Sequence, residues 1–359
     1  MRKIILILFA LIVSFTAIGC TGGNGCSCTQ EDPVSYYVKW TGSEDALTDY
    51  KEVATYKVAY KDNFNENDFN YKKVDEIGCK MDVSKDSKYV VTTEIVKKEA
   101  IPANAKVDSG YKGKYYKITT NLSVIPTYTI GSTVETCYDS VYSEVYFYDE
   151  TYGFAPIYSI KNYDTSNISL NTDGYAEKII KYVYSTETIY DGGDITFKVI
   201  QDASTLPESE GIVSFPTINT HDGYDIKGDF KNFIDNETLL FACRNISLKD
   251  GESLKVVSPS YLNVEKINVS KVTESNTYLT ISVNGTSDEA TIPTTRLAVL
   301  RAAENNTGSA IIVDVQRSSF DLGGTEYNNA FMAKMITRLP SHIGALVYEL
   351  DTVQITPAK

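Results

Sequence analysis

The run Thr277-Tyr278-Leu279-Thr280-Ile281-Ser282-Val283-Asn284 decides the fold class. Leu279, Ile281 and Val283 recur at every second position with polar residues between them, so one side of an extended chain is apolar and the other is polar. An amphipathic helix repeats its apolar residues about every three to four positions instead. Alternation with period two is typical of a half-buried strand in an antiparallel sheet, and we predict a strand here.

The same period continues through much of the chain. Residues 180–188 and 346–350 alternate in the same way. Further strands are predicted at 52–60, 88–99, 114–124, 133–149, 156–163, 194–201, 261–272, 310–317 and 331–338. Several of these patterns are longer than the usual strand of about 5–6 residues, which favours one broad, curved sheet over a sandwich of short strands. The pattern at 297–304 fits either a strand or a helical turn.

Turn-forming residues separate the predicted strands. Asp191-Gly192-Gly193-Asp194 divides two strand patterns closely enough for a hairpin. Asn284-Gly285 and Gly323-Gly324 end later strands, because asparagine and glycine adopt the left-handed backbone that tight turns require. These positions predict antiparallel neighbours joined by short connections.

One segment departs from the alternating pattern. Asp235 is a good helix N-cap, Glu237 lies in the first turn, and Ile234 and Leu239 are placed to form a hydrophobic staple. One helical face carries Leu239, Leu240, Cys243 and Ile246. We predict a short helix at about 236–247. The predicted fold is therefore mostly β: a large curved antiparallel sheet, or half-barrel, with this helix packed on it.

The first residues have the features of an export signal. Met1-Arg2-Lys3 is positively charged, residues 4–13 are apolar, and Gly19-Cys20 follows small residues. The apolar run is shorter than the about 20 residues of a spanning helix. Cysteine directly after a small residue matches the bacterial lipobox, so we expect a lipoprotein signal peptide at 1–19 and a diacylglycerol on Cys20. The alternative is an ordinary signal peptide followed by a chance cysteine.

Lipid on Cys20 would anchor the protein to the outer face of a membrane in the bacterial cell envelope. Residues 20–34 are rich in glycine and read as a flexible tether. We expect residues 35–359 to form a single antiparallel β domain. The stretch 202–233, which carries several prolines and glycines, could separate two halves, although continuation of one sheet is the favoured interpretation.

Composition limits the partners. The chain has 27 tyrosines, 13 phenylalanines and one tryptophan, a balance that suits pleated sheet. A net charge of -13 argues against a nucleic-acid partner, which requires clustered Lys and Arg. Cys26 and Cys28 are separated by one residue, unlike the two-residue spacing of common zinc and redox sites. A bridge between Cys79 and Cys137 stays open, because spacing alone does not show whether they approach each other.

The order of elements resembles a known family. The segments that carry the resemblance are Tyr138-Asp139-Ser140-Val141, Val145-Tyr146-Phe147, Pro156-Ile157-Tyr158-Ser159-Ile160-Lys161, Asp235-Asn236-Glu237-Thr238-Leu239-Leu240-Phe241 with Arg244, Leu248 and Gly251 after it, and Tyr348-Glu349-Leu350. Over roughly residues 50–355 the chain is similar to an uncharacterised envelope family related to the LolA/LppX carriers of bacterial lipoproteins and lipids.

That resemblance implies a strongly curved antiparallel half-barrel whose concave face is partly covered by helix. In the carriers this face holds acyl chains, so it implies a hydrophobic small molecule or lipid as ligand. The chain shows one clear helix where the carriers have more cover, and no carrier residue transfers by identity.

Catalytic and metal motifs are not found in the sequence. Its two histidines, His221 and His342, lie among polar or small neighbours, and Asp149-Glu150 reads as an acidic turn. The sequence contains no Gly-x-Ser-x-Gly elbow and no glycine-rich phosphate loop. We therefore expect no enzyme activity, no metal and no cofactor.

One aromatic group remains to be assigned: Tyr138, Tyr142, Tyr146 and Tyr148. These tyrosines fit cross-strand packing better than a stacking platform for a ligand. Two functions stay open. The first is a membrane-anchored protein that binds an apolar or amphipathic ligand on the concave face. The second is a structural or adhesive surface module that contacts a protein or glycan.

Overall fold

The computed structural model describes residues 50–61, 75–149, 152–191, 194–201, 217–219, 234–246, 248, 253–260, 263–301, 311–339 and 344–356. The predicted signal peptide, the tether, Cys20, Cys26, Cys28 and both histidines lie outside these ranges, as does most of 202–233. Among the residues that are described, no helix is long and apolar enough to cross a membrane.

Fourteen strands form one sheet in the order β11-β10-β9-β8-β7-β4-β3-β1-β19-β18-β15-β14-β13-β12. Their bounds are β1 Lys51–Lys61, β3 Lys88–Val96, β4 Tyr115–Val124, β7 Asp139–Tyr148, β8 Pro156–Leu170, β9 Ala176–Asp191, β10 Asp194–Gln201, β11 Thr217–Asn219, β12 Ser253–Ser260, β13 Asn263–Val283, β14 Thr286–Arg301, β15 Ile311–Gln316, β18 Met332–Arg338 and β19 Ala345–Thr356. Neighbours in this order pair antiparallel, and β13 adds a short parallel contact with β19.

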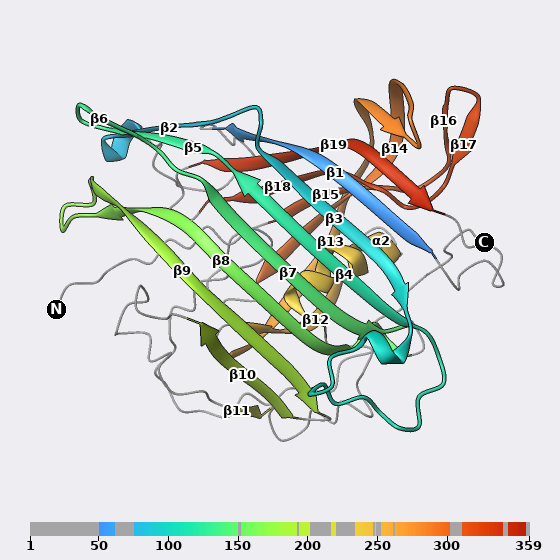
Figure 1. The fold of residues 1–359 in the computed structure, drawn as a ribbon. Coiled ribbons are helices and arrows are strands. Elements are labelled where there is room, and N and C mark those ends of the chain that lie inside the picture. The colour runs from blue at the N-terminus through green and yellow to red at the C-terminus, as the bar shows by residue number, and fades with distance from the viewer. Residues whose placement is uncertain are drawn as a thin grey trace.

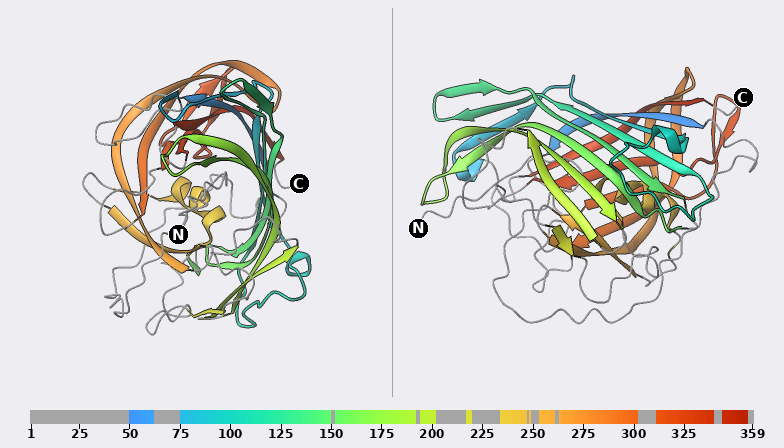
Figure 2. Two further views of the ribbon diagram at one scale, coloured as in Figure 1. Left: turned by 90° about the vertical axis from the view of Figure 1, so that its left-hand side faces the viewer. Right: turned by 60° about the horizontal axis from the view of Figure 1, so that its bottom comes forward.

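The sheet curls around the short helix α2, Leu239–Asn245 (Figures 1 and 2). The end-on view in Figure 2 shows the strands arranged as an arc with α2 inside it. Register shifts in several strand pairs, such as the one between Thr55 and Tyr56 where β1 meets β19, supply the local bends that curvature requires. The predicted fold class, a large curved antiparallel sheet with one short helix, is confirmed.

Some predicted strands have different bounds in the structure. The two strands predicted at 261–272 and 277–284 are replaced by one strand of 21 residues, β13, Asn263–Val283, which continues through a register shift between Lys271 and Thr273. Residues 133–149 divide into β6, Thr133–Thr136, and β7, because the chain leaves one sheet for another at Cys137 and Tyr138. Most of the ambiguous pattern at 297–304 lies in β14.

The predicted turns are formed. Asp191 pairs with Asp194 across the β9–β10 hairpin. Asn284 and Gly285 have φ values of 50° and 87° between β13 and β14, and Gly323 and Gly324 have 59° and 80°. Two successive residues with positive φ match the turn that best fits the twist of a two-residue hairpin. Gly323 and Gly324 join β16, Phe320–Leu322, to β17, Thr325–Tyr327.

A small second sheet was not predicted. It consists of β2, Cys79–Val83, β5, Pro126–Ile130, and β6, in the order β2-β5-β6. Only Ile125 separates β5 from β4, so the small sheet continues one end of the large one (Figure 1). These strands have at most five residues each and β5 begins with proline, so their alternation is too short to stand out from loop sequence.

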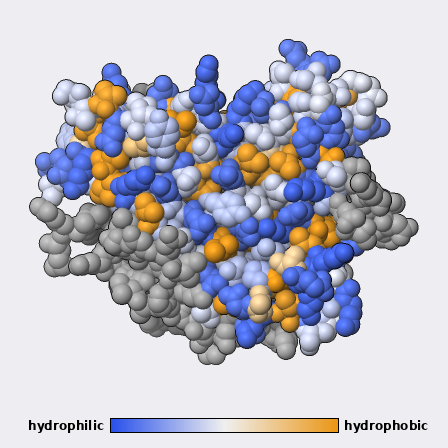
Figure 3. Space-filling model, viewed as in Figure 1, coloured by the Kyte–Doolittle hydropathy of each residue, from blue (hydrophilic) through white to orange (hydrophobic). Residues whose placement is uncertain are grey.

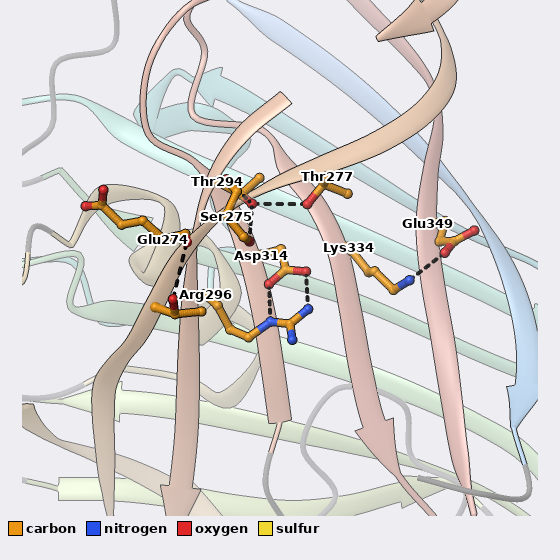
Figure 4. A network of polar contacts seen from close by, with 9 residues as sticks. Glu274, Ser275, Thr277, Thr294, Arg296, Asp314, Lys334 and Glu349 are labelled. Atoms are coloured by element: carbon orange, nitrogen blue, oxygen red, sulfur yellow. Dashed lines mark hydrogen bonds and ion pairs between the residues drawn. The ribbon is translucent and has the colours of Figure 1, made fainter. Parts of the chain in front are cut away.

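Ion pairs and hydroxyl contacts connect neighbouring strands on the side of the sheet formed by β13, β14, β15, β18 and β19 (Figure 4). Arg296 of β14 donates two hydrogen bonds to Asp314 of β15, at 2.7 and 2.9 Å. Lys334 of β18 lies 2.7 Å from Glu349 of β19. In both cases the two residues are direct partners in the strand register, so each pair reinforces that register.

Candidate functional site

The helix begins where the sequence predicts but is shorter. A 3-10 turn at Asn236–Thr238 leads into α2, which ends at Asn245 and not at 247. Asp235 is the N-cap of that 3-10 turn, and its carboxylate accepts a hydrogen bond from the backbone N–H of Glu237 at 2.8 Å. The Asn245 side chain donates to the Phe241 carbonyl at 2.7 Å, and Ile246 is already extended. The helix is buried nearly all around, whereas a single buried face was predicted.

A buried lysine ties the start of this segment to the sheet. Lys161 of β8 lies 3.4 Å from Asp235 and 3.3 Å from Glu237. Asp235 also accepts hydrogen bonds from the hydroxyls of Ser159 and Tyr190. All five residues are buried, and two carboxylates share one ammonium group. The hydrogen bonds from Ser159 and Tyr190 help to offset the desolvation of this cluster.

Burial and charge oppose each other in this cluster. Burial alone would lower the pKa of Lys161, but the charges of Asp235 and Glu237 outweigh it and raise that pKa above its usual value. Burial raises the pKa of Glu237 to about 7, although Lys161 acts in the opposite direction. Near neutral pH, Glu237 is therefore divided between its protonated and ionised forms.

A second ion pair holds the end of α2. Arg244 donates to both carboxylate oxygens of Glu52 in β1, at 2.7 and 3.0 Å. It also donates to the backbone carbonyls of Ala330 and Asn329. Tyr50 donates to Glu52 at 2.8 Å. This bidentate arrangement satisfies most of the donors of the guanidinium group and fixes the direction of α2 inside the arc.

Apolar side chains fill the space between the two ion pairs. Leu239, Leu240, Ala242 and Cys243 belong to the main hydrophobic core together with residues from both halves of the sheet. Phe241 packs against rings of β4, β7 and the following turn, with centroid distances of 5.9, 5.3 and 5.2 Å to Tyr116, Phe147 and Phe154. The concave face beneath α2 is therefore occupied by protein side chains, and its charged cluster is buried from solvent.

Tyrosines line the concave face beyond the helix. Tyr89 lies 5.7 Å from both Tyr56 and Tyr348, measured between ring centroids. Tyr163 and Tyr184 are direct partners in the β8–β9 register and stack at 4.5 Å. Because alternate residues of a strand point to the same face, Thr165 and Asn167 lie on the same face of β8 as Tyr163. We call Tyr56, Tyr89, Tyr163, Tyr184 and Tyr348 the tyrosine lining.

Several buried polar atoms near this lining have no hydrogen-bond partner among the described residues. They include the Tyr128 hydroxyl, one carboxylate oxygen of Asp139, the Thr165 hydroxyl and both side-chain amide atoms of Asn167. Each of these side chains is at most 2% exposed. An unpaired buried polar atom costs about 1–3 kcal/mol, so this group marks the most unusual part of the described structure.

The aromatic cluster expected at 138–148 is mostly packed on the convex face. Tyr146 and Tyr148 lie in a hydrophobic cluster with Ile101, Tyr111 and Tyr115, beneath the segment between β3 and β4. Tyr111 of that cluster lies 4.7 Å from Tyr148, measured between ring centroids. Of the other two tyrosines of the set, Tyr142 donates a hydrogen bond to Glu144 and Tyr138 is 71% exposed. The structure therefore makes these tyrosines part of cross-strand and loop packing, except for Tyr138.

Cys79 and Cys137 do not form a bridge. Cys79 pairs with Ile130 of β5, whereas the Cys137 N–H donates to the carbonyl of Pro126 at the other end of β5. Four residues of extended chain span about 13 Å, well beyond the about 7 Å limit for the Cα atoms of a disulfide. Cys79, Cys137 and Cys243 are free thiols.

Sequence reasoning identified Asp235 and Glu237 only as helix-capping residues, and it missed Glu52, Lys161, Asp139, Thr165 and Asn167. A lysine or threonine at a strand position carries no local signal of what faces it across the arc. Among the described residues, no group of three or more His, Cys, Asp or Glu is arranged to hold a metal.

Comparisons with known proteins show no family for this chain. No family model matches the chain, and no curated protein matches it. Among solved structures, the chain is similar to the "Beta-barrel-like Protein of Domain of Unknown Function DUF1849" from Brucella abortus. The TM-score is 0.41 with 7% identity, over 87% of this chain and 99% of that one. What the structure itself shows is a mostly β, barrel-like antiparallel fold with one short helix.

Proposed function

We propose that this chain is an envelope lipoprotein, anchored through a lipid on Cys20, that binds an amphipathic ligand beside the tyrosine lining. The observation that carries the proposal is the group of buried polar atoms without partners among the described residues, set next to aromatic rings on the concave face. Apolar rings with a few placed polar groups are the usual composition of a small-molecule site.

The relation to the LolA/LppX carriers belongs to this proposal and does not rest on the comparisons. Its support is the shared arrangement of a curved antiparallel sheet with a helix against its concave face. The ligand would lie towards the small sheet, because side chains already fill the space beneath α2. We propose no catalytic reaction at the buried Lys161 cluster, since its charged groups are paired with one another.

The test is to purify the full chain from its native membrane and to identify the molecules that solvent extracts from it without breaking covalent bonds. Acyl chains on Cys20 remain attached to the N-terminal peptide, so peptide mapping separates the anchor from a ligand. We expect about one ligand per protein in the wild type and less in Tyr163→Ala, because that change removes one ring of the stacked pair. Thr277→Val, in β13, is the control and retains the ligand.

A second function is favoured by one observation. Large hydrophobic side chains are exposed around the small sheet, with Val134 at 64%, Tyr138 at 71% and Tyr175 at 55%. The face shown in Figure 3 otherwise has apolar and polar residues interspersed. If the purified chain yields no ligand, the proposal fails and a surface module that contacts a protein or glycan through this end becomes the better explanation.

A further inference from the structure

The polar atoms without partners come from three strands that meet at one end of the barrel-like sheet. Thr165 and Asn167 are two residues apart on one face of β8, about 6.6 Å along the strand. Asp139 of β7 reaches the residue between them, because one of its carboxylate oxygens accepts from the backbone N–H and the hydroxyl of Ser166. Its other oxygen is the one without a partner.

Tyr128 lies at the same end of the sheet as Asp139. β5 begins next to β7, since Val124 pairs with Asp139 and only Ile125 separates β4 from β5. The charge of Asp139 contributes to the raised pKa of Tyr128, after burial as the main cause. We call Tyr128, Asp139, Thr165 and Asn167 the buried polar residues.

The hydrogen-bonding capacity of these residues selects a chemical class. The Asn167 amide nitrogen only donates and its oxygen only accepts, whereas the Asp139 carboxyl accepts when ionised and also donates when protonated; the two hydroxyls do both. An ammonium group has donors alone and would leave the Asn167 nitrogen unpaired. A phosphate or carboxylate has acceptors alone when ionised, and it would bring a charge into a buried site. A group of several hydroxyls donates and accepts, and it carries no charge into the buried site.

We propose that the buried polar residues bind a polyhydroxyl group, either a free sugar or polyol or the sugar head of a glycolipid. The inference rests on the proposed function, since it names the polar part of the same amphipathic ligand. Because these side chains are at most 2% exposed, access depends on separation of the small sheet from the β8–β9 hairpin.

The experiment uses the full chain in lauryldimethylamine oxide, a detergent without hydroxyl groups, so that detergent does not compete as a sugar detergent would. Calorimetric titrations use methyl glucoside, mixed micelles of phosphatidylcholine with the same detergent, and such micelles that also contain glucosyl diacylglycerol. Binding of both sugar-bearing probes supports a free polyhydroxyl ligand, and binding of the glycolipid micelles alone supports a lipid source. Binding equal to that of plain phosphatidylcholine overturns the inference.

Variants connect the binding to the site. Thr165→Val and Asn167→Leu should each weaken sugar-dependent binding about 10-fold, which corresponds to one lost hydrogen bond of about 1.4 kcal/mol. Without ligand, Thr165→Val should unfold at the same temperature as the wild type or higher, because it removes a buried hydroxyl that lacks a partner. Thr277→Val, whose hydroxyl contacts that of Thr294, is the matched control and should lower the unfolding temperature without changing binding.

Two results separate this inference from the proposed function. If a ligand without hydroxyl groups co-purifies and the sugar probes do not bind, the inference is wrong but the proposed function is supported. A preparation with no ligand, in which a crystal structure shows only water bonded to the buried polar residues, overturns both.

Discussion

Arg244 of α2 and Glu52 of β1 are 192 positions apart in the sequence and form a bidentate ion pair, with N···O distances of 2.7 and 3.0 Å. Their side chains are 8% and 2% exposed. This pair and the Lys161 cluster hold the two ends of the helical segment inside the sheet, so the position of α2 depends on charges from β1 and β8, which lie four positions apart in the strand order.

Removing one partner of this pair should be strongly destabilising. Arg244→Met leaves Glu52 as a buried charge with only Tyr50 bonded to it, and we expect a loss of about 3–5 kcal/mol in the free energy of unfolding. The double variant Glu52→Gln, Arg244→Met should recover part of that loss. Urea unfolding of the single and double variants measures the coupling. Lys57→Met, which removes an exposed partner of Asp351, should cost less than about 1 kcal/mol.

Lys161→Met should destabilise the protein and steepen its dependence on pH. It leaves Asp235 and Glu237 buried beside each other without a counter-charge, a change expected to cost about 3–5 kcal/mol at neutral pH. The variant should recover stability as the pH is lowered and Glu237 becomes protonated. Unfolding curves between pH 5 and 8 test this; Lys57→Met, which removes the exposed partner of Asp351, serves as control. Equal losses for both variants would contradict the structural role given to Lys161.

Asp139 should make the protein more stable in mild acid than at neutral pH. Burial raises the pKa of its carboxyl to about 7, with Asp164 adding to the rise and Lys181 and the bonds from Ser166 opposing it. The folded protein therefore binds a proton that the unfolded chain has released. Between its ordinary pKa and about 7, stability falls as pH rises, by up to about 1.4 kcal/mol per pH unit.

Asp139→Asn should remove that component, because the amide stays neutral and its oxygen still accepts from Ser166. The measurement is the free energy of unfolding from pH 4 to pH 8, compared with Asp288→Asn at an exposed position in β14. Glu237 contributes a slope of the same sign, so the variant should have a reduced slope and not a flat one. An unchanged slope would show that Asp139 is not the responsible group.

The three described cysteines should differ in reactivity. Burial raises the pKa of Cys79 to about 11 and that of Cys243 to about 12, so few thiolates form at neutral pH. Cys137 is half-buried and should react first with iodoacetamide, followed by the other two only when the protein unfolds. Peptide mapping after timed labelling resolves the order. A disulfide between Cys79 and Cys137 in the native protein would contradict the register of β2, β5 and β6.

Local sequence patterns predicted the elements well where the pattern was long or the turn chemistry specific. The strands at 52–60, 114–124 and 194–201 were placed within one or two residues. Asp235 was correctly identified as the cap at the start of the helical segment, because capping depends on neighbours in the chain. The small sheet escaped notice because its strands are short and one begins with proline.

The site residues could not be predicted in the same way. Thr165, Asn167 and Lys161 occupy ordinary positions in the alternation of β8, and nothing nearby in the sequence distinguishes an inward-facing residue that meets a partner from one that does not. Their importance comes from Asp139, Asp235 and Glu237, which other parts of the chain bring to them.

By itself, then, the sequence determined the antiparallel strands, the hairpin turns and the start of the helix, since period-two alternation, left-handed turn residues and capping are properties of neighbouring residues. It also carries the lipobox pattern around Cys20, which stays a prediction. Only the tertiary structure decided that α2 lies inside the curved sheet between two buried ion pairs. It also decided that polar atoms from β5, β7 and β8 converge without partners among the described residues. The physical reason is that burial and charge pairing depend on contacts between residues far apart in the chain, and curvature of the sheet creates those contacts.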